Sequence, residues 1–102
     1  MLPLIETRRA DIAALCRRFH VRRLDVFGSA ARLSDFDPAR SDVDVLVEYQ
    51  SGNGADIEQY LALRDALSEI VGRPVDLVVA GAVENPFVRA GIERSRQVLY
   101  AA

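Results

Sequence analysis

The chain has 102 residues, half of them hydrophobic and 27% charged, and its formal net charge is −2. This composition is typical of one globular domain, spanning 1–102, with a single hydrophobic core. A slightly acidic chain is poorly suited to gripping a nucleic-acid backbone, which usually needs a basic face, so no direct nucleic-acid binding is expected. The sequence has neither an apolar run of membrane-spanning length nor a signal-peptide pattern, which favours a cytoplasmic protein without membrane contact.

The first quarter of the chain is predicted to form one helix and one short strand. Residues 5–20 have apolar side chains at helical spacing, and they are expected to pack on a sheet. This apolar stripe consists of Ile12, Leu15, Cys16 and Phe19. His20, the only histidine, is a candidate for catalysis, although a histidine that interacts with the last carbonyl groups of a helix is commoner. The apolar run 24–27 predicts a strand.

Beyond residue 41 the pattern alternates between strand and helix. The predicted elements are a strand over 42–49, a helix over 56–71, a strand over 75–79, a helix over 86–94 and a strand over 97–100. The stripe of the helix over 56–71 consists of Ile57, Tyr60, Leu61, Leu67, Ile70 and Val71. Asn85 and Pro86 suit the N-cap and first position of the next helix. This alternation predicts a compact α/β domain.

A glycine and a serine follow the first predicted strand. Gly28 and Ser29 stand where the strand over 24–27 would end and a short helix would begin. At such a junction the backbone N–H groups and the serine hydroxyl can face an anion. The pair therefore predicts a turn that binds phosphate.

Aspartates alternate with apolar residues at the start of the next strand. Because strand side chains repeat every second residue, Asp42 and Asp44 are expected to point to the same face. Asp76, in the strand over 75–79, supplies a third carboxylate. Carboxylate oxygens suit Mg²⁺, and neighbouring carboxylates can bridge two ions about 3.5–4 Å apart. These three residues are the predicted metal ligands.

Two further observations bear on the aspartates. A carboxylate between Val75 and Leu77 is expected to destabilise the strand unless Asp76 has a partner or an ion. Asp35 and Asp37 share the spacing of the strand pair, but they fall in a polar loop. A solvated loop does not hold ions rigidly, so these two are not expected to be ligands.

At this point the chain resembles the DNA polymerase β-like nucleotidyltransferase superfamily, and within it the minimal nucleotidyltransferases (MNT) that act as antitoxins. The resemblance covers nearly the whole chain and rests on 27–32 (FGSAAR), 41–47 (SDVDVLV), 72–78 (GRPVDLV) and 85–87 (NPF). It implies an α+β fold with a small mixed or antiparallel sheet flanked by helices. It also implies Mg²⁺-dependent transfer of AMP from ATP to a tyrosine of a HEPN ribonuclease toxin, which would form a hetero-oligomer with this chain.

The resemblance also implies a role for each site residue. Asp42 and Asp44 would hold two Mg²⁺ ions, and Asp76 would bind the second ion and orient, or take the proton from, the attacking hydroxyl. Gly28 and Ser29 would bind the β- and γ-phosphates of ATP. A further candidate is Arg32, which either contacts phosphate or faces the partner protein.

Two features depart from the family pattern, and other functions stay open. Leu33 stands where the family usually has glycine, and the connector before Asp42 is about two residues longer than the shortest in the family. The alternatives are an antitoxin that only occludes its toxin, or a nucleotidyltransferase that acts on a small molecule. Phe87, Val88 and Tyr100 are candidates for a partner interface, although a core position is favoured for all three.

Overall fold

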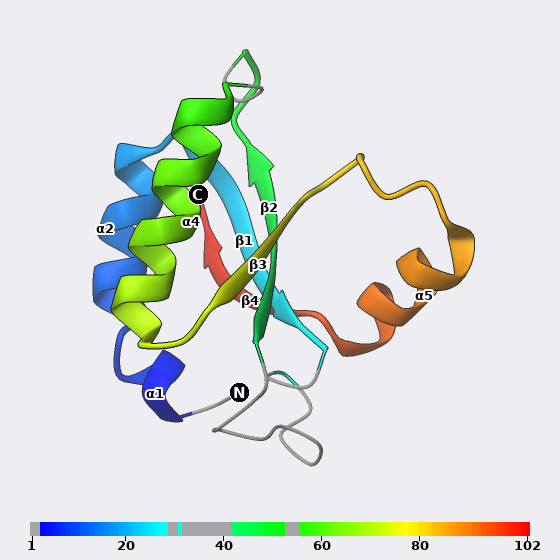
Figure 1. Ribbon diagram of the computed structural model, residues 1–102, viewed down its shortest axis with the longest axis horizontal. Helices are drawn as coiled ribbons and strands as arrows, with labels where there is room; N and C mark the ends of the chain where they lie inside the picture. Colours follow the sequence, from blue (N-terminus) through cyan, green and yellow to red (C-terminus); the bar gives the residue numbers. More distant parts are fainter. Residues whose placement is uncertain (1–2, 29–30, 32–41, 53–55) are drawn as a thin grey trace.

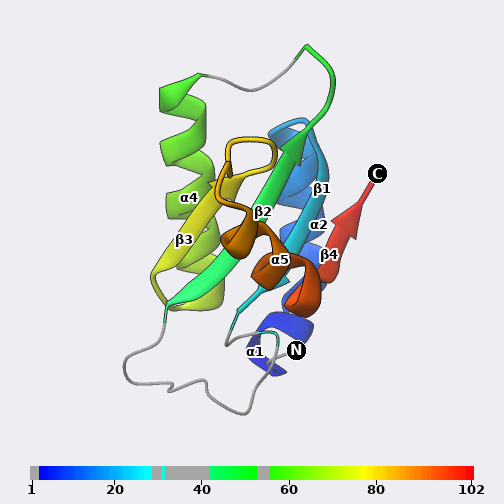
Figure 2. The same ribbon diagram turned by 90° about the vertical axis from the view of Figure 1, so that its right-hand side faces the viewer.

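The computed structural model describes residues 3–28, 31, 42–52 and 56–102. In chain order the elements are α1 (Pro3–Glu6), α2 (Arg9–Arg18), β1 (Val21–Phe27), β2 (Val43–Tyr49), α4 (Ile57–Val71), β3 (Val75–Val79), α5 (Pro86–Ser95) and β4 (Gln97–Ala101). Figure 1 shows the sheet nearly edge-on, with α2 and α4 packed together on one face and α5 on the other. Figure 2 shows α5 crossing in front of β1 and β2.

The sheet has the strand order β3-β2-β1-β4. β1 is antiparallel to both of its neighbours, β2 and β4, whereas β2 and β3 are parallel. The parallel strands are joined through α4, because two strands that run the same way need a crossover connection. The expected α+β fold, with a small mixed sheet flanked by helices, is confirmed.

One face of the sheet supplies the hydrophobic core. Along β2, Val43, Val45 and Val47 are buried in a cluster with the inner faces of α2 and α4. Because side chains alternate along a strand, Asp44 and Leu46 face the opposite side, where α5 lies. Burial of the valines therefore determines which face of β2 carries its polar residues.

The predicted helix over 5–20 is wrong in its first third. The chain forms two helices there, α1 and α2, separated by a turn at residues 7–8. Residues 6–11 contain no large apolar side chain that could tie them to the sheet at helical spacing. The stripe of α2 is buried as predicted, at Ile12, Leu15 and Cys16. Burial disfavours the thiolate and raises the pKa of Cys16 to about 12, so this thiol stays protonated at neutral pH.

Helix α4 has clear local signals at both ends. The Asp56 side chain accepts a hydrogen bond from the backbone N–H of Glu58, and Gly72 ends the helix in the left-handed region with φ 71°. The predicted stripe is wrong at Ile57 and Leu61, which are 65% and 38% exposed. At about 100° per residue these two lie to one side of the face that meets the sheet. The residues buried on that face are Leu63, Leu67 and Val71.

The last two elements begin where the sequence predicted them. Asn85 caps α5, because its side-chain oxygen accepts from the backbone N–H groups of Phe87 and Val88, and Pro86 takes the first helical position. Strand β4 follows at once and closes the sheet beside β1. Among the residues described, no helix is long and apolar enough to cross a membrane.

A buried aspartate ties α5 to the sheet. Asp25, in β1, is fully buried on the α5 side. Its carboxylate accepts from Arg23 Nε at 3.0 Å and pairs with Arg96 Nη2 at 2.5 Å. Arg96 also binds Glu93 at 2.6 Å. A buried charge is tolerated only when paired and hydrogen-bonded, and this carboxylate has two cationic partners.

We predict that Asp25→Asn lowers the free energy of unfolding by about 3 kcal/mol, because it removes the buried carboxylate that pairs with Arg23 and Arg96 and leaves Arg96 only the exposed Glu93. The matched control is Asp65→Asn. Asp65 pairs with Arg64 at the surface, where such a pair contributes less than about 1 kcal/mol. Urea unfolding of both variants measures the difference, and equal losses would contradict a stabilising role for the Asp25 network.

Candidate functional site

Two of the predicted carboxylates are neighbours across the parallel strands. Asp44 of β2 is in register with Asp76 of β3, so both side chains project from the same face of adjacent strands about 4.8 Å apart. Asp42 lies one residue before β2, whose start is held by the Val43 N–H bond to Pro74 O at 2.9 Å. Asp42 and Asp76 are exposed, whereas Asp44 is half-buried. A ligand can therefore reach this face of the sheet where the three aspartates lie.

The turn after β1 lies against Asp44. Phe27 is in register with Asp44, and Gly28, the next residue, has φ 68°. A Cβ atom at Gly28 would lie 2.5 Å from Asp44 Oδ2, which is closer than real Cβ contacts. The N–H of Ala31 bonds back to Gly28 O at 3.1 Å. Glycine is required here twice, by its left-handed backbone and by the approach of the carboxylate.

The backbone N–H of Gly28 already has an acceptor. It donates to Ser95 Oγ, at the end of α5, over 3.0 Å. The predicted nucleotide-binding role of Gly28 therefore rests on the conformation of the turn and on its close contact with Asp44. Ser29 and Arg32, the other predicted nucleotide-binding residues, lie outside the described residues, as do Leu33, Asp35 and Asp37. Their roles stay predictions.

The predicted metal ligands include two carboxylates that share one face of the sheet. Over the described ranges of the chain, no three His, Cys, Asp or Glu side chains cluster closely enough to hold an ion. Asp44 and Asp76 nevertheless form a register-matched pair of hard oxygen donors on one face, which is the donor chemistry that Mg²⁺ prefers. The pair fits a divalent ion, and the exposed Asp42 lies two residues from Asp44.

The buried carboxylate of the sheet is Asp25, not Asp76. Asp76 was expected to destabilise an apolar strand, but β3 is an edge strand and Asp76 is exposed on it. Asp25 is the aspartate that is desolvated, and sequence reasoning missed it together with Ser95. The only sequence signal for Asp25 is its position between Leu24 and Val26 in an apolar run.

His20 lies at the other end of the sheet. It follows α2, is exposed, and has a left-handed backbone with φ 58°. The next residue, Val21, pairs with Tyr49. The Phe27 to Asp44 pairing is at the opposite end of β1, six residues or about 20 Å further along. His20 therefore ends a helix, and the catalytic alternative finds no support.

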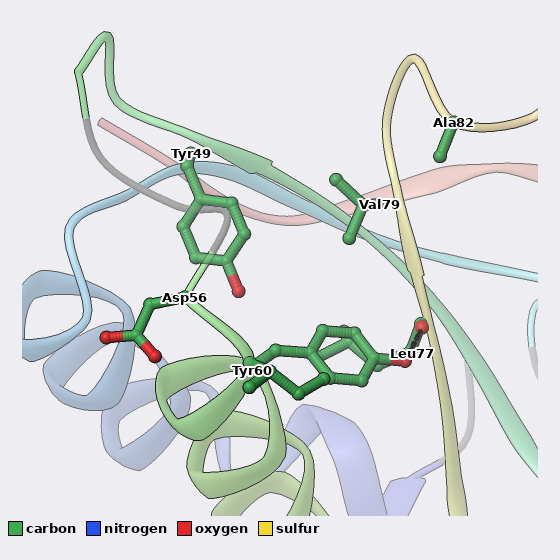
Figure 3. A pocket seen from close by; sticks show the side chains of 7 residues that line it. Tyr49, Asp56, Tyr60, Leu77, Val79 and Ala82 are labelled. Carbon is green, nitrogen blue, oxygen red and sulfur yellow. Dashed lines mark hydrogen bonds between the residues drawn. The ribbon is translucent and has the colours of Figure 1, made fainter.

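Two cavities flank the sheet. A cleft of about 500 Å³ is lined by Tyr49, Ile57, Tyr60, Leu77 and Val79, among others, and Figure 3 shows the two tyrosines facing it. It lies toward the end of β2 that is remote from Asp44. A smaller cavity of about 220 Å³ lies between Leu46 and α5, where Arg89 and Ile92 line it. Leu46, which lines the smaller cavity, lies two residues after Asp44 and on the same face of β2.

Comparison with known proteins identifies the family. Residues 12–99 match the nucleotidyltransferase domain, and the chain belongs to this family. It is 37% identical over 79 residues to a Methanocaldococcus jannaschii protein named "Putative protein adenylyltransferase MJ0128", covering 78% of this chain and 76% of that protein. The prediction of a nucleotidyltransferase enzyme is confirmed.

Two solved structures support this assignment. One, described as a "putative minimal nucleotidyltransferase", superposes with a TM-score of 0.73 at 30% identity and covers 94% of this chain and 95% of that one. The other, a tri-AMPylated Shewanella oneidensis HEPN toxin in complex with an MNT antitoxin, gives a TM-score of 0.67 at 17% identity, with 96% and 73% covered. The second likeness concerns the fold alone. The expected membership among the minimal nucleotidyltransferases is confirmed.

We predict that Gly28→Ala is more destabilising than Gly72→Ala, although both replace a left-handed glycine at a cost of roughly 1–2 kcal/mol. A Cβ at Gly72 meets nothing within 4 Å, whereas at Gly28 it collides with the Asp44 carboxylate. The pair of variants thus separates backbone strain from the contact. Urea unfolding measures both losses, and indistinguishable values would mean that Asp44 can move aside freely.

Proposed function

We propose that this chain is an antitoxin that transfers AMP from ATP to a tyrosine hydroxyl of a partner HEPN ribonuclease toxin and so neutralises it. The observation that carries the proposal is the register-matched pair Asp44 and Asp76, with the Gly28 turn against Asp44. The name of the Methanocaldococcus jannaschii relative supports protein adenylylation. The likeness in fold to the toxin complex supports a HEPN partner.

The carboxylate face provides the groups that this reaction needs. Asp42 and Asp44 would hold two Mg²⁺ ions, and Asp76 would share the second. When bound, these ions neutralise charge on the triphosphate and lower the pKa of the acceptor hydroxyl. The triphosphate of ATP would lie against Gly28, where the turn after β1 begins.

Asp76 is the residue to which we assign the acceptor hydroxyl. It orients the tyrosine hydroxyl and accepts its proton as the oxygen attacks the α-phosphorus. The bond from the α-phosphorus to the oxygen that bridges to the β-phosphate breaks, and pyrophosphate leaves. Asp76 is exposed on edge strand β3, so a side chain of another protein can approach it from solvent.

An apolar surface lies at the start of α5. Phe87 is 85% exposed and Val88 50% exposed, so the core position favoured from the sequence is wrong for both. Tyr100 does pack against the core, as favoured. The physical reason for the difference is that α5 packs through Ile92, one turn further along, whereas its first turn lies farther from the sheet. Since α5 covers the face that carries the carboxylates, Phe87 and Val88 are the surface that we assign to the partner.

We predict that Asp42→Ala and Asp44→Ala each reduce AMP transfer by more than about a hundredfold, because metal ligation contributes several kcal/mol of charge stabilisation. The fold should persist, since Asp42 is exposed and Asp44 is half-buried, and neither belongs to the hydrophobic core. The matched control is Glu48→Gln, which removes a charge from the same strand and face at its other end. Intact-mass spectrometry of a candidate HEPN protein, incubated with each variant, ATP and Mg²⁺, measures the transfer.

A mass gain of whole AMP units that requires Asp44 and not Glu48 would support the proposal. A partner that gains no mass but still forms a stable complex with the wild-type chain would favour an occluding antitoxin. Turnover on a free small acceptor without any partner would favour the small-molecule enzyme. Normal transfer by a folded Asp44→Ala protein would overturn the metal assignment.

We predict that Phe87→Ser weakens binding of the HEPN partner by more than about tenfold, as expected for an aromatic anchor in an interface. Ile57→Ser is the control, because Ile57 is also exposed, at 65%, but belongs to α4 on the opposite face of the sheet. Isothermal titration of the partner against each variant measures the affinities. Equal affinities for the two variants would remove α5 from the interface.

A further inference from the structure

The junction between α5 and β4 holds the turn at the end of β1. Three consecutive residues, Ser95, Arg96 and Gln97, each hydrogen-bond to β1 or to the residues that follow it. Their partners lie 66 to 71 positions earlier in the chain. We name these three residues the clasp. Figure 2 shows the helix of this junction crossing in front of β1 before the chain enters β4.

Ser95 has the most specific contact of the clasp. Its hydroxyl donates to the backbone carbonyl of Gly91 at 3.1 Å, one helical turn earlier in α5. With its proton committed there, the same oxygen accepts from the N–H of Gly28 at 3.0 Å. The hydroxyl therefore has a fixed orientation, and it joins the end of α5 to the first residue of the turn.

The other two residues of the clasp bind one residue that precedes Gly28 and one that follows it in the chain. Arg96 binds the buried Asp25, which lies three residues before Gly28 in the chain. Gln97 donates from Nε2 to the carbonyl oxygen of Ala31 at 3.3 Å, three residues after Gly28. Three hydrogen-bonded contacts from the clasp thus hold the backbone at and on either side of Gly28 in the chain.

Gly28 also lies against a site carboxylate. Its α-carbon lies so close to Asp44 that a Cβ there would be 2.5 Å from Oδ2. A displacement of the Gly28 backbone would therefore change the space beside the Asp44 carboxylate directly. The hydrogen bonds of the clasp to the turn make no use of the three site carboxylates.

We infer that Ser95 is a positioning residue for nucleotide binding, because its hydroxyl accepts from the N–H of Gly28 and so holds the turn against Asp44. Gln97 supports the same turn from the Ala31 side. Neither residue touches the reacting atoms. This inference rests on the proposed function, since it assumes that the turn binds ATP.

The test measures nucleotide affinity in the whole chain without any partner protein. Isothermal titration with AMP-PNP and Mg²⁺ is carried out on the wild type, Ser95→Ala and Ser95→Thr. Ser95→Ala should weaken binding by about fivefold, the size of one lost hydrogen bond of about 1 kcal/mol. Ser95→Thr, which keeps the hydroxyl, should stay within about twofold of the wild type. Amide hydrogen exchange at Gly28 should be faster in Ser95→Ala only.

Two further variants keep the test independent of stability. Asp56→Ala removes the N-cap of α4, near the end of the sheet remote from Asp44, and should lower the melting temperature without changing the affinity for AMP-PNP. Gln97→Glu replaces the amide donor with a carboxylate, which cannot donate to the Ala31 carbonyl, so AMP-PNP should bind more weakly. Because residue 97 is exposed, this variant should still fold.

The outcomes separate this inference from the proposed function. Weaker binding by Ser95→Ala and Gln97→Glu, with Ser95→Thr and Asp56→Ala like the wild type, supports it. Wild-type affinity in Ser95→Ala, or the same loss in Asp56→Ala, overturns it and leaves the proposed function standing. A wild-type chain that binds no AMP-PNP overturns the proposed function, and the inference fails with it.

Discussion

The parallel pairing of β2 with β3 is the constraint on which the carboxylate face depends. Val43 pairs with Val75 and Val45 with Leu77, and all four are buried in the core. A shift of this register by one residue would turn every side chain of one strand to the other face, so burial of these four residues determines the alignment. Asp44 and Asp76 alternate with them and are brought together on the opposite face as a consequence. Hydrophobic packing on the helix side thus positions the polar pair on the other side.

The second face of the sheet carries a buried ion-pair network centred on Asp25. The ion pairs of Asp25 with Arg23 and Arg96 are desolvated to different degrees, since Asp25 is fully buried and the arginine side chains are 39% and 20% exposed. Buried pairs of this kind are weak evidence for added stability, but losing one partner leaves an uncompensated charge. They therefore fix where α5 ends. Through Ser95, that end is tied to Gly28, and Gly28 contacts Asp44.

The chain belongs to the nucleotidyltransferase family, and the two faces of its sheet have different roles. One face of the sheet, with α2 and α4, forms the core, and the other, which carries α5, leaves Asp42 and Asp76 exposed. A site on an open sheet face can be approached by a macromolecular acceptor without rearrangement of the core. The exposed Phe87 at the start of α5 extends this face with an apolar surface, the kind of feature that marks interaction sites.

The sequence alone was enough to predict the local structure: the alternation of valines with aspartates in β2, the capping of α5, and the glycine after β1. These features depend on residues that are close in the chain, where periodicity and caps act directly. Only the tertiary structure decided that Asp25 is buried and Asp76 exposed, that Phe87 faces solvent, and that Ser95 accepts from Gly28. Each of these depends on which distant segment packs alongside, and strand order and the docking of α5 leave no periodic trace in the sequence.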